Sequence, residues 1–376
     1  MRVLQISKFY PPVMGGIESV AWELTEGLNQ AGVRTDVLCA NQRPRTAREL
    51  APAGYSITRA ASWGMLLSTS MAPAMARLLR RLAADHDVLH IHMPDPMAAV
   101  ALWVARPRSR VVVHWHSDVI RQRVALKLYE PLQNWLLGRA DAIVATSAAY
   151  AEASRVLQPW RHKVAVIPIG ISDNHSQACS IQAAAIRQRF RGRRIVFSLG
   201  RMTYYKGFDV LIDAAAMLPE DSVVVIGGDG ELLDSYRTMV ARQGLAGKVH
   251  LLGHIDDDEL ASHFEACDVF CMPSTVRAEA YGVAMVEAMV MGKPIVATHI
   301  PGSGVPWVNV HGETGFNVEV RRPDELSATL NLLLADAPLR KRLGAKARQR
   351  YLQEFNAALM TQRTIGLYRR LLLDGR

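Results

Sequence analysis

The sequence predicts an α/β protein made of two Rossmann-like, doubly wound domains. First, a chain of 376 residues is longer than one hydrophobic core usually supports, so two domains are expected. Second, short runs rich in Val and Ile alternate with amphipathic segments, and this series occurs twice. Third, the runs lack strict polar alternation, which is typical of parallel strands covered by helices on both faces. The two domains are expected to face a central cleft, where ligands bind beyond the carboxyl ends of the strands.

Each expected strand is one of these apolar runs. In the first domain they are residues 2–7, 35–40, 87–92, 110–116, 141–147 and 163–168. In the second domain they are residues 194–200, 222–228, 249–253, 268–274 and 293–298. We therefore expect an amino-terminal domain over 1–167 and a carboxyl-terminal domain over 193–354, joined by a polar, basic linker. Arg, Leu and Ala at helical spacing predict a last helix at about 355–376 that packs back on the first domain.

Composition and charge limit the classes of function. Hydrophobic residues make up 49% and charged residues 21% of the chain, which excludes a disordered or fibrous protein. The net charge of +9 predicts an anionic partner: nucleic acid, a phosphorylated ligand or an acidic membrane surface. The amino terminus has no signal-peptide core, the cysteines lack metal-site spacing, and the longest apolar stretch, 97–105, is too short to span a bilayer. We expect a cytoplasmic protein, with any membrane contact peripheral and on the inner face of the cytoplasmic membrane.

Gly15 and Gly16 follow the first expected strand and precede a helical segment. Glycine at this position lets a ligand approach free backbone N–H groups at the positive end of the helix dipole. A tight turn that requires positive φ explains the pair equally well. Both interpretations stay open on the sequence.

Arg201 and Lys206 lie on one strand-to-helix loop in the second half of the chain. A planar guanidinium and a mobile ammonium can together hold a diphosphate, although such a pair is more often a solvated loop. Further on, Gly282 precedes a strongly helical run between Glu279 and Glu287. A helix that begins there would direct its first free N–H groups into the cleft, with Glu287 one turn further on the same face. Each glutamate could accept hydrogen bonds from hydroxyls, and the alternative for each is a solvated helix face.

Four motifs in order resemble those of the retaining, nucleotide-sugar-dependent glycosyltransferases of family GT4. They are the Gly15-Gly16 loop, HSD at residues 116–118, the GRMTYYKG loop at 200–207 and the segment 279–287. The resemblance covers nearly the whole chain and implies the two-domain GT-B fold. The sequences GRMTYYKGF, HSDVIRQ and SGVPWVNVHGETG are most similar to bacterial O-antigen mannosyltransferases.

The resemblance implies a role for each matched residue. The implied catalytic residues are His116, Glu279, Arg201 and Lys206. The implied donor-binding residues are Gly16, Tyr281, Gly282, Val283, Ala284, Glu287, Gly253 and His254. Gly15 and Asp118 are expected on the acceptor side. Within this set, Arg201, Lys206 and the N–H groups of Val283 and Ala284 would bind the donor diphosphate, Glu287 the ribose, and Glu279 and His116 the transferred sugar.

Leaving-group chemistry agrees with these roles. Breaking a sugar–phosphate bond concentrates negative charge on the departing diphosphate, and two cations with a helix amino terminus can stabilise that charge without a metal. We therefore expect no metal and no cofactor beyond the nucleotide-sugar substrate. In the mechanism usually proposed for the family, the departing phosphate takes the acceptor proton on the same face of the sugar, which retains configuration without a protein nucleophile.

Other patterns suggest different chemistry. Residues 85–87 (Asp-His-Asp) and 256–258 (Asp-Asp-Asp) fit the Asp-any-Asp pattern of metal-dependent sugar transferases. The first directly precedes a strand and the second opens a helix, so structural roles are favoured. Gly228 and Gly230 suggest a dinucleotide fingerprint, but Leu233 stands where the third glycine belongs, so a tight strand-to-helix turn is favoured over a dehydrogenase.

Two His-x-His pairs, His90 with His92 and His114 with His116, fall on adjacent expected strands, and each pair points to one face. Four histidines could hold a metal ion, yet no carboxylate is spaced to complete a coordination set. Only His116 matches a family motif. The other three are interpreted as satisfied polar residues near strand ends.

Residues 65–82 show apolar residues at helical spacing and end in a basic group of Arg77, Arg80 and Arg81. The predicted helix could rest on anionic lipid and receive a lipid-linked acceptor. A helix packed on its sheet with a solvated basic end is an equal alternative.

The resemblance predicts a retaining hexosyltransferase of lipopolysaccharide O-chain or related polysaccharide biosynthesis. It would move mannose from GDP-mannose to a polyprenyl-diphosphate-linked oligosaccharide, with GDP-rhamnose or a UDP-hexose as alternative donors. A basic nucleic-acid-binding protein is the alternative from another class. Because the strands lack interleaved aromatic and basic residues, no nucleic-acid partner is expected.

Overall fold

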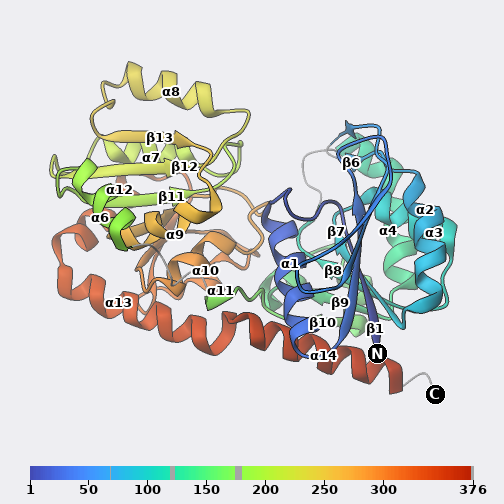
Figure 1. The fold of residues 1–376 in the computed structure, drawn as a ribbon. Coiled ribbons are helices and arrows are strands. Elements are labelled where there is room, and N and C mark those ends of the chain that lie inside the picture. Colours follow the sequence, from blue (N-terminus) through green and yellow to red (C-terminus); the bar gives the residue numbers. More distant parts are fainter. Residues whose placement is uncertain (68, 119–122, 174–179, 374–376) are drawn as a thin grey trace. The chain divides into compact units, whose positions relative to one another are not determined.

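The structure, a computed structural model, describes residues 1–67, 69–118, 123–173 and 180–373. The chain forms two compact units, each containing its own parallel sheet (Figure 1). Unit 1 comprises Met1–Ile171 and Ala357–Arg376, and unit 2 comprises Ser172–Asn356. The last helix of the chain therefore belongs to the same unit as the amino terminus.

Unit 1 is built on a sheet with the strand order β10-β9-β8-β7-β1-β2-β4-β3. All neighbouring strands run parallel except β3, which is antiparallel to β4 at the edge. The strands are β1 Arg2–Ser7, β2 Arg34–Ala40, β3 Ala47–Leu50, β4 Ser56–Ala60, β7 Val88–Met93, β8 Arg110–Trp115, β9 Ala142–Ala145 and β10 Val164–Val166. A separate antiparallel hairpin joins β5, Met65–Leu66, to β6, Thr69–Ser70.

Helices cover both faces of this sheet (Figure 1). They are α1 Gly16–Gln30, α2 Ala74–Leu82, α3 Pro96–Ala105, α4 Arg123–Arg139, α5 Ala148–Ala153 and α14 Ala357–Leu373. Helix α14 begins where the Ala357 N–H donates to the Ile171 carbonyl, 3.0 Å away. It also buries Tyr368 fully, on the sheet face that carries His90.

Unit 2 has an all-parallel sheet with the order β13-β12-β11-β14-β15-β16. The strands are β11 Arg194–Leu199, β12 Ser222–Gly227, β13 Val249–Gly253, β14 Val269–Met272, β15 Ile295–His299 and β16 Gly315–Glu319. The helices are α6 Ser180–Arg189, α7 Phe208–Ala215, α8 Leu233–Arg242, α9 Asp257–Ala266, α10 Val283–Val290, α11 Val305–Val308, α12 Pro323–Ala335 and α13 Ala337–Arg350. A π-helical turn, Tyr351–Phe355, follows α13.

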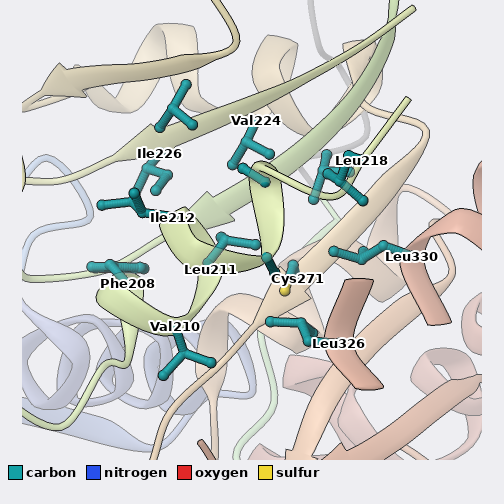
Figure 2. Close-up of a cluster of buried hydrophobic side chains, with 14 of the residues drawn as sticks. Phe208, Val210, Leu211, Ile212, Leu218, Val224, Ile226, Cys271, Leu326 and Leu330 are labelled. Atoms are coloured by element: carbon teal, nitrogen blue, oxygen red, sulfur yellow. The ribbon is translucent and has the colours of Figure 1, made fainter. Parts of the chain in front are cut away.

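The core of unit 2 lies between the sheet and helices α7 and α12. Leu211 from α7, Val224 from β12, Cys271 from β14 and Leu330 from α12 are all fully buried there (Figure 2). Each such side chain stabilises the fold by about 1.5–3 kcal/mol through its removal from water. Because the strands are anchored in this core, the loops at their carboxyl ends are held in fixed places.

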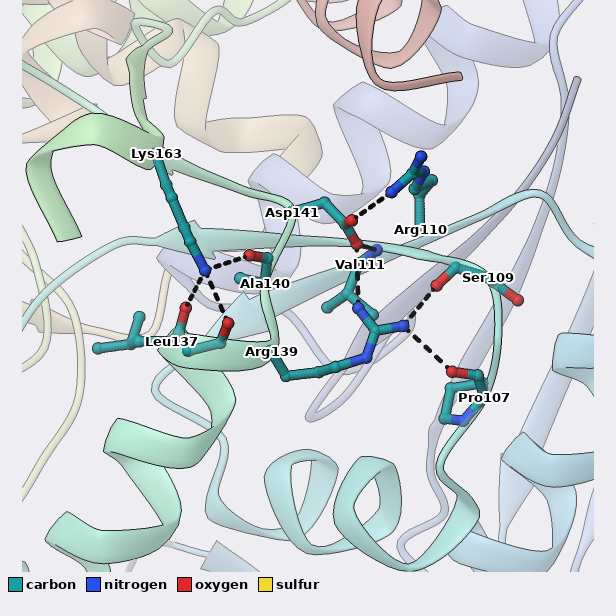
Figure 3. Close-up of polar contacts among 10 residues, drawn as sticks. Pro107, Ser109, Arg110, Val111, Leu137, Arg139, Ala140, Asp141 and Lys163 are labelled. Atoms are coloured by element: carbon teal, nitrogen blue, oxygen red, sulfur yellow. Dashed lines mark hydrogen bonds and ion pairs between the residues drawn. The ribbon is translucent and has the colours of Figure 1, made fainter. Parts of the chain in front are cut away.

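A polar network ties together the amino ends of three strands in unit 1 (Figure 3). The Asp141 carboxylate accepts hydrogen bonds from Arg110 at 2.7 Å, from the Val111 N–H at 2.8 Å and from Arg139 at 3.0 Å. Lys163 donates to the Gly138 and Ala140 carbonyls at 2.7 and 2.9 Å, which places a cation at the carboxyl end of α4. Arg110 is thus engaged in holding the sheet together.

The α/β class and every expected strand are confirmed, with boundaries within two residues. Strands β3, β4 and β16 were not expected. Their sequences AREL, SITRA and GFNVE are short and partly polar, so they lack the apolar runs that marked the central strands.

The helix expected over 65–82 is wrong in its first half. Met65–Leu66 and Thr69–Ser70 are the paired strands β5 and β6, and only Ala74–Leu82 is helical. The short strands pair locally, with the Trp63 N–H donating to the Met71 carbonyl at 3.0 Å, which the apolar spacing alone could not reveal. In the described part of the chain, no helix combines the length and apolar content needed to cross a membrane.

Candidate active site

Two backbone segments meet at the carboxyl ends of β11 and β12. The Gly200 N–H donates to the Gly227 carbonyl at 3.1 Å, and the Met202 N–H donates to the Asp229 carbonyl at 2.8 Å. Gly228 has φ of 123°, and a Cβ there would lie 2.0 Å from the Gly200 carbonyl oxygen. Glycine at 228 therefore allows the loop that carries Arg201 and Lys206 to pack against the end of β12. This close approach accounts for the glycines that resembled a dinucleotide fingerprint.

Lys206 and Glu279 form the central contact of unit 2. The Lys206 ammonium donates to Glu279 Oε2 at 2.6 Å, and the Ser274 hydroxyl donates to the same oxygen at 3.0 Å. The two side chains are only 13% and 10% exposed. An ion pair this sheltered from water is stronger than one at the surface, because solvent screens it less. The other carboxylate oxygen, Oε1, has no hydrogen-bond partner among the described residues.

The electrostatics keep Lys206 positively charged. Burial alone lowers the pKa of its ammonium, but the Glu279 carboxylate and Tyr205 outweigh that effect and hold the pKa above its ordinary value. Arg201, on the same loop, opposes this shift through its own positive charge. Arg201 itself is exposed.

Helix α10 begins next to this pair. Gly282 is its N-cap, with φ of 86°, and a Cβ there would lie 2.7 Å from Met285 Cε and 2.8 Å from Met272 Cε. The Met285 N–H already donates to the Gly282 carbonyl at 2.9 Å. The N–H groups of Val283 and Ala284, both half-buried, precede the intrahelical ladder and give the helix terminus its partial positive charge.

Neighbouring loops fix the segment before α10. The Glu279 carbonyl accepts a hydrogen bond from the Ser303 hydroxyl, and the Ala280 carbonyl accepts one from the Gly304 N–H at 2.8 Å. Tyr281 is buried, with its ring 6.1 Å from that of Phe355. The backbone that carries the Glu279 carboxylate is therefore fixed in place.

The remaining donor residues lie at separate places in unit 2. Glu287 is half-buried and lies one turn into α10, as the helical spacing predicted. Gly253 ends β13, with φ of 73° and open space around its Cα. His254 is exposed, with Nε2 3.5 Å from Asp256 Oδ1.

In unit 1, Gly15 and Gly16 form the open amino end of α1. Gly15 is the N-cap with an extended φ of −171°, and Gly16 has no positive φ either. The tight-turn interpretation is therefore wrong. A Cβ on Gly16 would meet no atom within 4 Å, whereas one on Gly15 would meet Glu18 Oε2 at 2.7 Å. The exposed backbone at Gly16 is thus accessible to a ligand.

His116 and Asp118 follow β8. The His116 N–H donates to the Met93 carbonyl at 3.0 Å, and the residue is 6% exposed. Asp118 Oδ1 accepts hydrogen bonds from Trp115 Nε1 at 2.9 Å and from the Ser154 hydroxyl at 2.8 Å. These contacts tie Asp118 to Trp115 and Ser154, and its expected place on the acceptor side stays a prediction.

The four strand histidines form one buried cluster on the sheet. His90 Nδ1 lies 2.6 Å from the Tyr368 hydroxyl, and His90 Nε2 lies 3.2 Å from His114 Nδ1. His92 Nδ1 lies 2.9 Å from His116 Nε2. Ring nitrogens of His90, His92 and His114 lie within 4.8 Å of one another, close enough to be considered for a metal ion. His90 and His92 are satisfied polar residues as predicted, whereas His114 Nε2 has no hydrogen-bond partner among the described residues.

Comparison with known proteins decides the family. A family model described as Glycosyltransferase Family 4 matches residues 14–175, and one described as Glycosyl transferases group 1 matches residues 182–350. The D-rhamnosyltransferase WbpZ of Pseudomonas aeruginosa is 34% identical over 95% of this chain and 93% of its own length. The O-antigen chain mannosyltransferase C of Escherichia coli is 31% identical over 99% of both chains. The chain belongs to glycosyltransferase family 4.

Solved structures agree on the fold of this glycosyltransferase. Sucrose-phosphate synthase from Thermosynechococcus elongatus matches with a TM-score of 0.84 at 20% identity, over 99% of both chains. Anabaena Alr3699/HepE in complex with UDP and glucose matches with a TM-score of 0.77 at 21% identity, over 98% of this chain and 99% of that one. The glycosyltransferase thus has the GT-B fold, and the two units are its Rossmann-like domains.

Some residues of the glycosyltransferase's candidate site were not found from the sequence. Ser274, which donates to Glu279, ends the expected strand 268–274 without any motif of its own. Its position directly after β14, five residues before Glu279, was the available signal, because ligand-binding groups gather at the carboxyl ends of parallel strands. Gln5, which lies behind His92, is a buried strand residue that no motif marks, and the contact of His92 with His116 was not predicted.

Proposed function

We propose that this glycosyltransferase moves a hexose, with retention of configuration, from a GDP-sugar to a lipid-linked oligosaccharide in O-chain or related polysaccharide biosynthesis. The observation that carries the proposal is the sheltered Lys206–Glu279 pair beside the amino end of α10. Such a site presents a cation, a carboxylate and free N–H groups together. A nucleotide sugar needs all three. The cation and the N–H groups would bind its diphosphate, and the carboxylate would bind hydroxyls of the sugar.

The diphosphate contacts follow from the hydrogen-bond donors that each group has left to offer. A lysine ammonium has three N–H donors, and Glu279 takes one of those of Lys206, so two are left for phosphate oxygens. Arg201 adds an exposed guanidinium, and the α10 terminus adds the N–H groups of Val283 and Ala284. Because these donors are in place before bond cleavage, they stabilise the leaving diphosphate without reorganisation.

The sugar contact is assigned to Glu279 Oε1. Oε2 is already occupied by Lys206 and Ser274, which fixes the carboxylate plane. Oε1 then accepts hydrogen bonds from hydroxyls of the transferred sugar. Glu287, one turn further along α10, is assigned to the ribose hydroxyls.

Retention needs no protein nucleophile in this proposal. The departing phosphate takes the acceptor proton while the new glycosidic bond forms on the same face of the sugar. Since the protein's own cations meet the developing charge, the reaction is proposed to need no metal and no cofactor. Removal of divalent cations by a chelator should leave the transfer rate within about twofold of the untreated rate, a difference of less than about 0.5 kcal/mol in activation free energy. Strict dependence on added Mg²⁺ or Mn²⁺ would contradict this assignment.

The donor is assigned to a GDP-hexose because of the named relatives. The mannosyltransferase of Escherichia coli is 31% identical, and a Mycobacterium tuberculosis relative named as GDP-mannose-dependent is 27% identical. Mannose is our first choice. Rhamnose is the second candidate, because the relative named as a D-rhamnosyltransferase has the higher identity of 34%. A UDP-hexose is the third.

The acceptor is assigned to a lipid-linked glycan at an anionic membrane surface. The β5–β6 hairpin presents large apolar side chains to solvent: Trp63 is 76%, Leu66 59% and Leu67 60% exposed. Soluble proteins rarely expose such a group without a partner. In the same unit, α2 buries Met75 and Leu79 and leaves its arginines 77, 80 and 81 exposed. An apolar tip and nearby cations fit an anionic bilayer, where the enzyme would be peripheral on the inner face.

One experiment tests the donor assignment. Thermal stability and transfer should be measured with GDP-mannose, GDP-rhamnose, UDP-glucose and ADP-glucose. We expect the GDP-sugars to stabilise the enzyme and GDP-mannose to be transferred. A site that hydrogen-bonds the 6-hydroxyl should reject the 6-deoxy sugar by about 10⁴-fold, so a clear rhamnose preference identifies the second candidate. Binding of UDP-sugars alone would overturn the GDP assignment but leave the glycosyltransferase assignment in place.

A further inference from the structure

A chain of hydrogen bonds runs from the sheet interior to His116. The Gln5 side chain on β1 shares one sheet face with His92 on β7, and His116 directly follows β8. His92 Nε2 lies 3.0 Å from Gln5 Oε1, and His92 Nδ1 lies 2.9 Å from His116 Nε2. Gln5 is 0% and His92 1% exposed, so water does not compete for these bonds. His92 is therefore placed between one fixed side-chain oxygen and the ring of His116.

The chemistry of each group sets the direction of every hydrogen bond in this chain. An amide oxygen only accepts, so the proton of the Gln5–His92 bond lies on His92 Nε2. A neutral imidazole has one N–H, so His92 Nδ1 bears a lone pair and must accept. His116 Nε2 must then donate to it. His116 Nδ1 is left with a lone pair, and only Nε2 of this ring has a hydrogen-bond partner among the described residues.

The cluster keeps these rings neutral. Burial lowers the pKa of His92 and of His116 well below the ordinary histidine value, and the neighbouring imidazoles lower it further. His114 stacks on His116 with ring centroids 4.2 Å apart and an interplanar angle of 12°. Protonation of either ring would place a charge against buried neighbours, which is costly. The single-proton state on which the direction of the bonds depends is thus the stable one.

The other two histidines form a second chain, whose Tyr368 hydroxyl lies near Gln5. His90 joins the Tyr368 hydroxyl at 2.6 Å to His114 Nδ1 at 3.2 Å. His114 Nε2 has no hydrogen-bond partner in the described part of the chain. This second chain has the same burial and lies on the same strands, yet it makes no hydrogen bond to His116. It therefore offers a matched control.

We propose that Gln5 and His92 are positioning residues that fix His116 as the Nε2–H tautomer, with the Nδ1 lone pair turned to accept a hydrogen bond from a substrate hydroxyl. The inference rests on the proposed function for the identity of that substrate, a sugar or its glycan acceptor. His116 in this state accepts a hydrogen bond and gives none to the ligand. It orients a hydroxyl and does not act as an acid toward the leaving diphosphate.

The tautomer can be measured without substrate. Histidine labelled with ¹⁵N in the full-length protein reports which ring nitrogen carries the proton, and the His116→Gln variant identifies the His116 signals. At pH 7.5 we expect the Nε2–H form for both His92 and His116. An Nδ1–H form or a doubly protonated ring for His116 would overturn the proposal. So would a stoichiometric metal ion held by His90, His92 and His114 in the purified protein, since His92 would then be a ligand.

Three variants separate positioning from packing. His92→Leu removes the acceptor and should lower kcat/KM by about tenfold to 100-fold, the range found for groups that orient a metal-binding imidazole. His92→Gln restores an amide oxygen toward His116 Nε2 and should recover most of that loss. His90→Leu, the control in the second chain, should leave kcat/KM within about threefold, a change of less than about 0.7 kcal/mol. Equal losses in His92→Leu and His90→Leu would show a packing role and overturn the proposal.

The two proposals fail in different ways. If no nucleotide sugar is bound or transferred by the wild-type protein, the proposed function fails while the ¹⁵N spectrum still decides the tautomer. If transfer occurs and the spectrum shows the other tautomer, only the positioning role fails.

Discussion

At the residue scale, Lys206 has two tasks in its ion pair with Glu279. Lys206 neutralises a carboxylate that is only 10% exposed, and it also offers N–H groups to a ligand. Removing Lys206 alone leaves a buried charge with Ser274 as its partner, which costs about 3–5 kcal/mol in other proteins. A simple alanine variant therefore confuses loss of the fold with loss of binding. The Glu279→Gln variant disturbs the pair less, because the amide oxygen still accepts a hydrogen bond from the Lys206 ammonium.

The Glu279→Gln variant should affect binding and transfer in opposite directions. The amide keeps a hydrogen bond from Lys206 but removes the negative charge that competes with the diphosphate. We expect GDP to bind about fivefold more tightly, which corresponds to about 1 kcal/mol, because the Lys206 charge is no longer neutralised. Transfer should fall by about 10²-fold, because the carboxylate that holds the sugar hydroxyls is lost. Calorimetry of GDP binding and an initial-rate assay measure the two effects.

Matched loss of both binding and transfer in Glu279→Gln would contradict this division of tasks. Glu231→Gln is a suitable control, because it removes the same charge from another carboxylate of unit 2, which accepts a hydrogen bond from Thr203 at 3.3 Å. That control should leave both measurements near wild type.

The sequence could indicate which residues belong to the candidate site, but it could not show which of them contact each other. Arg201, Lys206 and Glu279 each stood in a recognisable motif, yet nothing in a spacing of 73 residues predicts that Lys206 and Glu279 touch. That contact depends on the order of β11 and β14 in the sheet, where the two strands are neighbours. The contact between His92 and His116 likewise depends on which strands are neighbours, here β7 and β8.

At the element scale, strands were predictable where they are apolar, and segments at the rim of unit 1 were not. The central strands β7 and β8 are almost wholly buried, so their apolar runs carried a clear signal. Met65, Leu66 and Leu67 also carried an apolar signal, but their side chains are 52%, 59% and 60% exposed. The spacing of apolar residues cannot distinguish a segment that packs on the core from one that is exposed to solvent or to a partner. This difference leads to a testable prediction.

The hairpin predicts a membrane test. The double variant Leu66→Ser, Leu67→Ser should weaken cosedimentation with phosphatidylglycerol vesicles by about tenfold or more, since each leucine contributes about 1.5–3 kcal/mol when it leaves water. Charge reversal of Arg77, Arg80 and Arg81 should weaken it further and abolish the difference from phosphatidylcholine vesicles. Leu332→Ser on α12, where the leucine is 49% exposed, serves as the control and should have no effect. Unchanged vesicle binding by the hairpin variant would exclude the hairpin as the contact.

The histidine cluster predicts how the stability of strands β7 and β8 depends on pH. Burial lowers the pKa of His90, His92 and His116 well below the ordinary value and that of His114 to about 3. As the pH falls, the histidines of the unfolded chain are protonated before those of the folded chain. The free energy of unfolding therefore falls as pH decreases from about 6.5 toward 3. Burial raises the pKa of Asp95 to about 6, which acts in the opposite direction and offsets one of the four. The net loss should reach at most about 4 kcal/mol per pH unit near pH 5.

Amide hydrogen exchange of β7 and β8 at pH 7 and pH 5.5, corrected for intrinsic rates, measures this loss. The variant His90→Leu should reduce the dependence, because one of the titrating groups is absent. Equal protection at both pH values in the wild-type protein would show that the cluster does not titrate in this way.

At the scale of the whole molecule, the net charge of +9 divides into separate functions. Arg110 and Arg139 hold the amino ends of strands through Asp141, so they serve the fold. Lys206 serves the candidate donor site in unit 2. Arg77, Arg80 and Arg81 remain as exposed cations on α2 for an anionic surface. The doubly wound halves were predictable from the repeated strand pattern, whereas this division required the contacts of each side chain.

The most direct test of the account is the discrimination between GDP and GMP. If Lys206 and the α10 terminus hold the donor diphosphate, the wild-type enzyme should bind GDP at least about tenfold more tightly than GMP, a difference of about 1.4 kcal/mol. The double variant Lys206→Met, Glu279→Gln, which leaves no unpaired buried charge, should lose most of this preference and most of its transfer from GDP-mannose. Wild-type preference and wild-type transfer in the folded double variant would contradict the central claim.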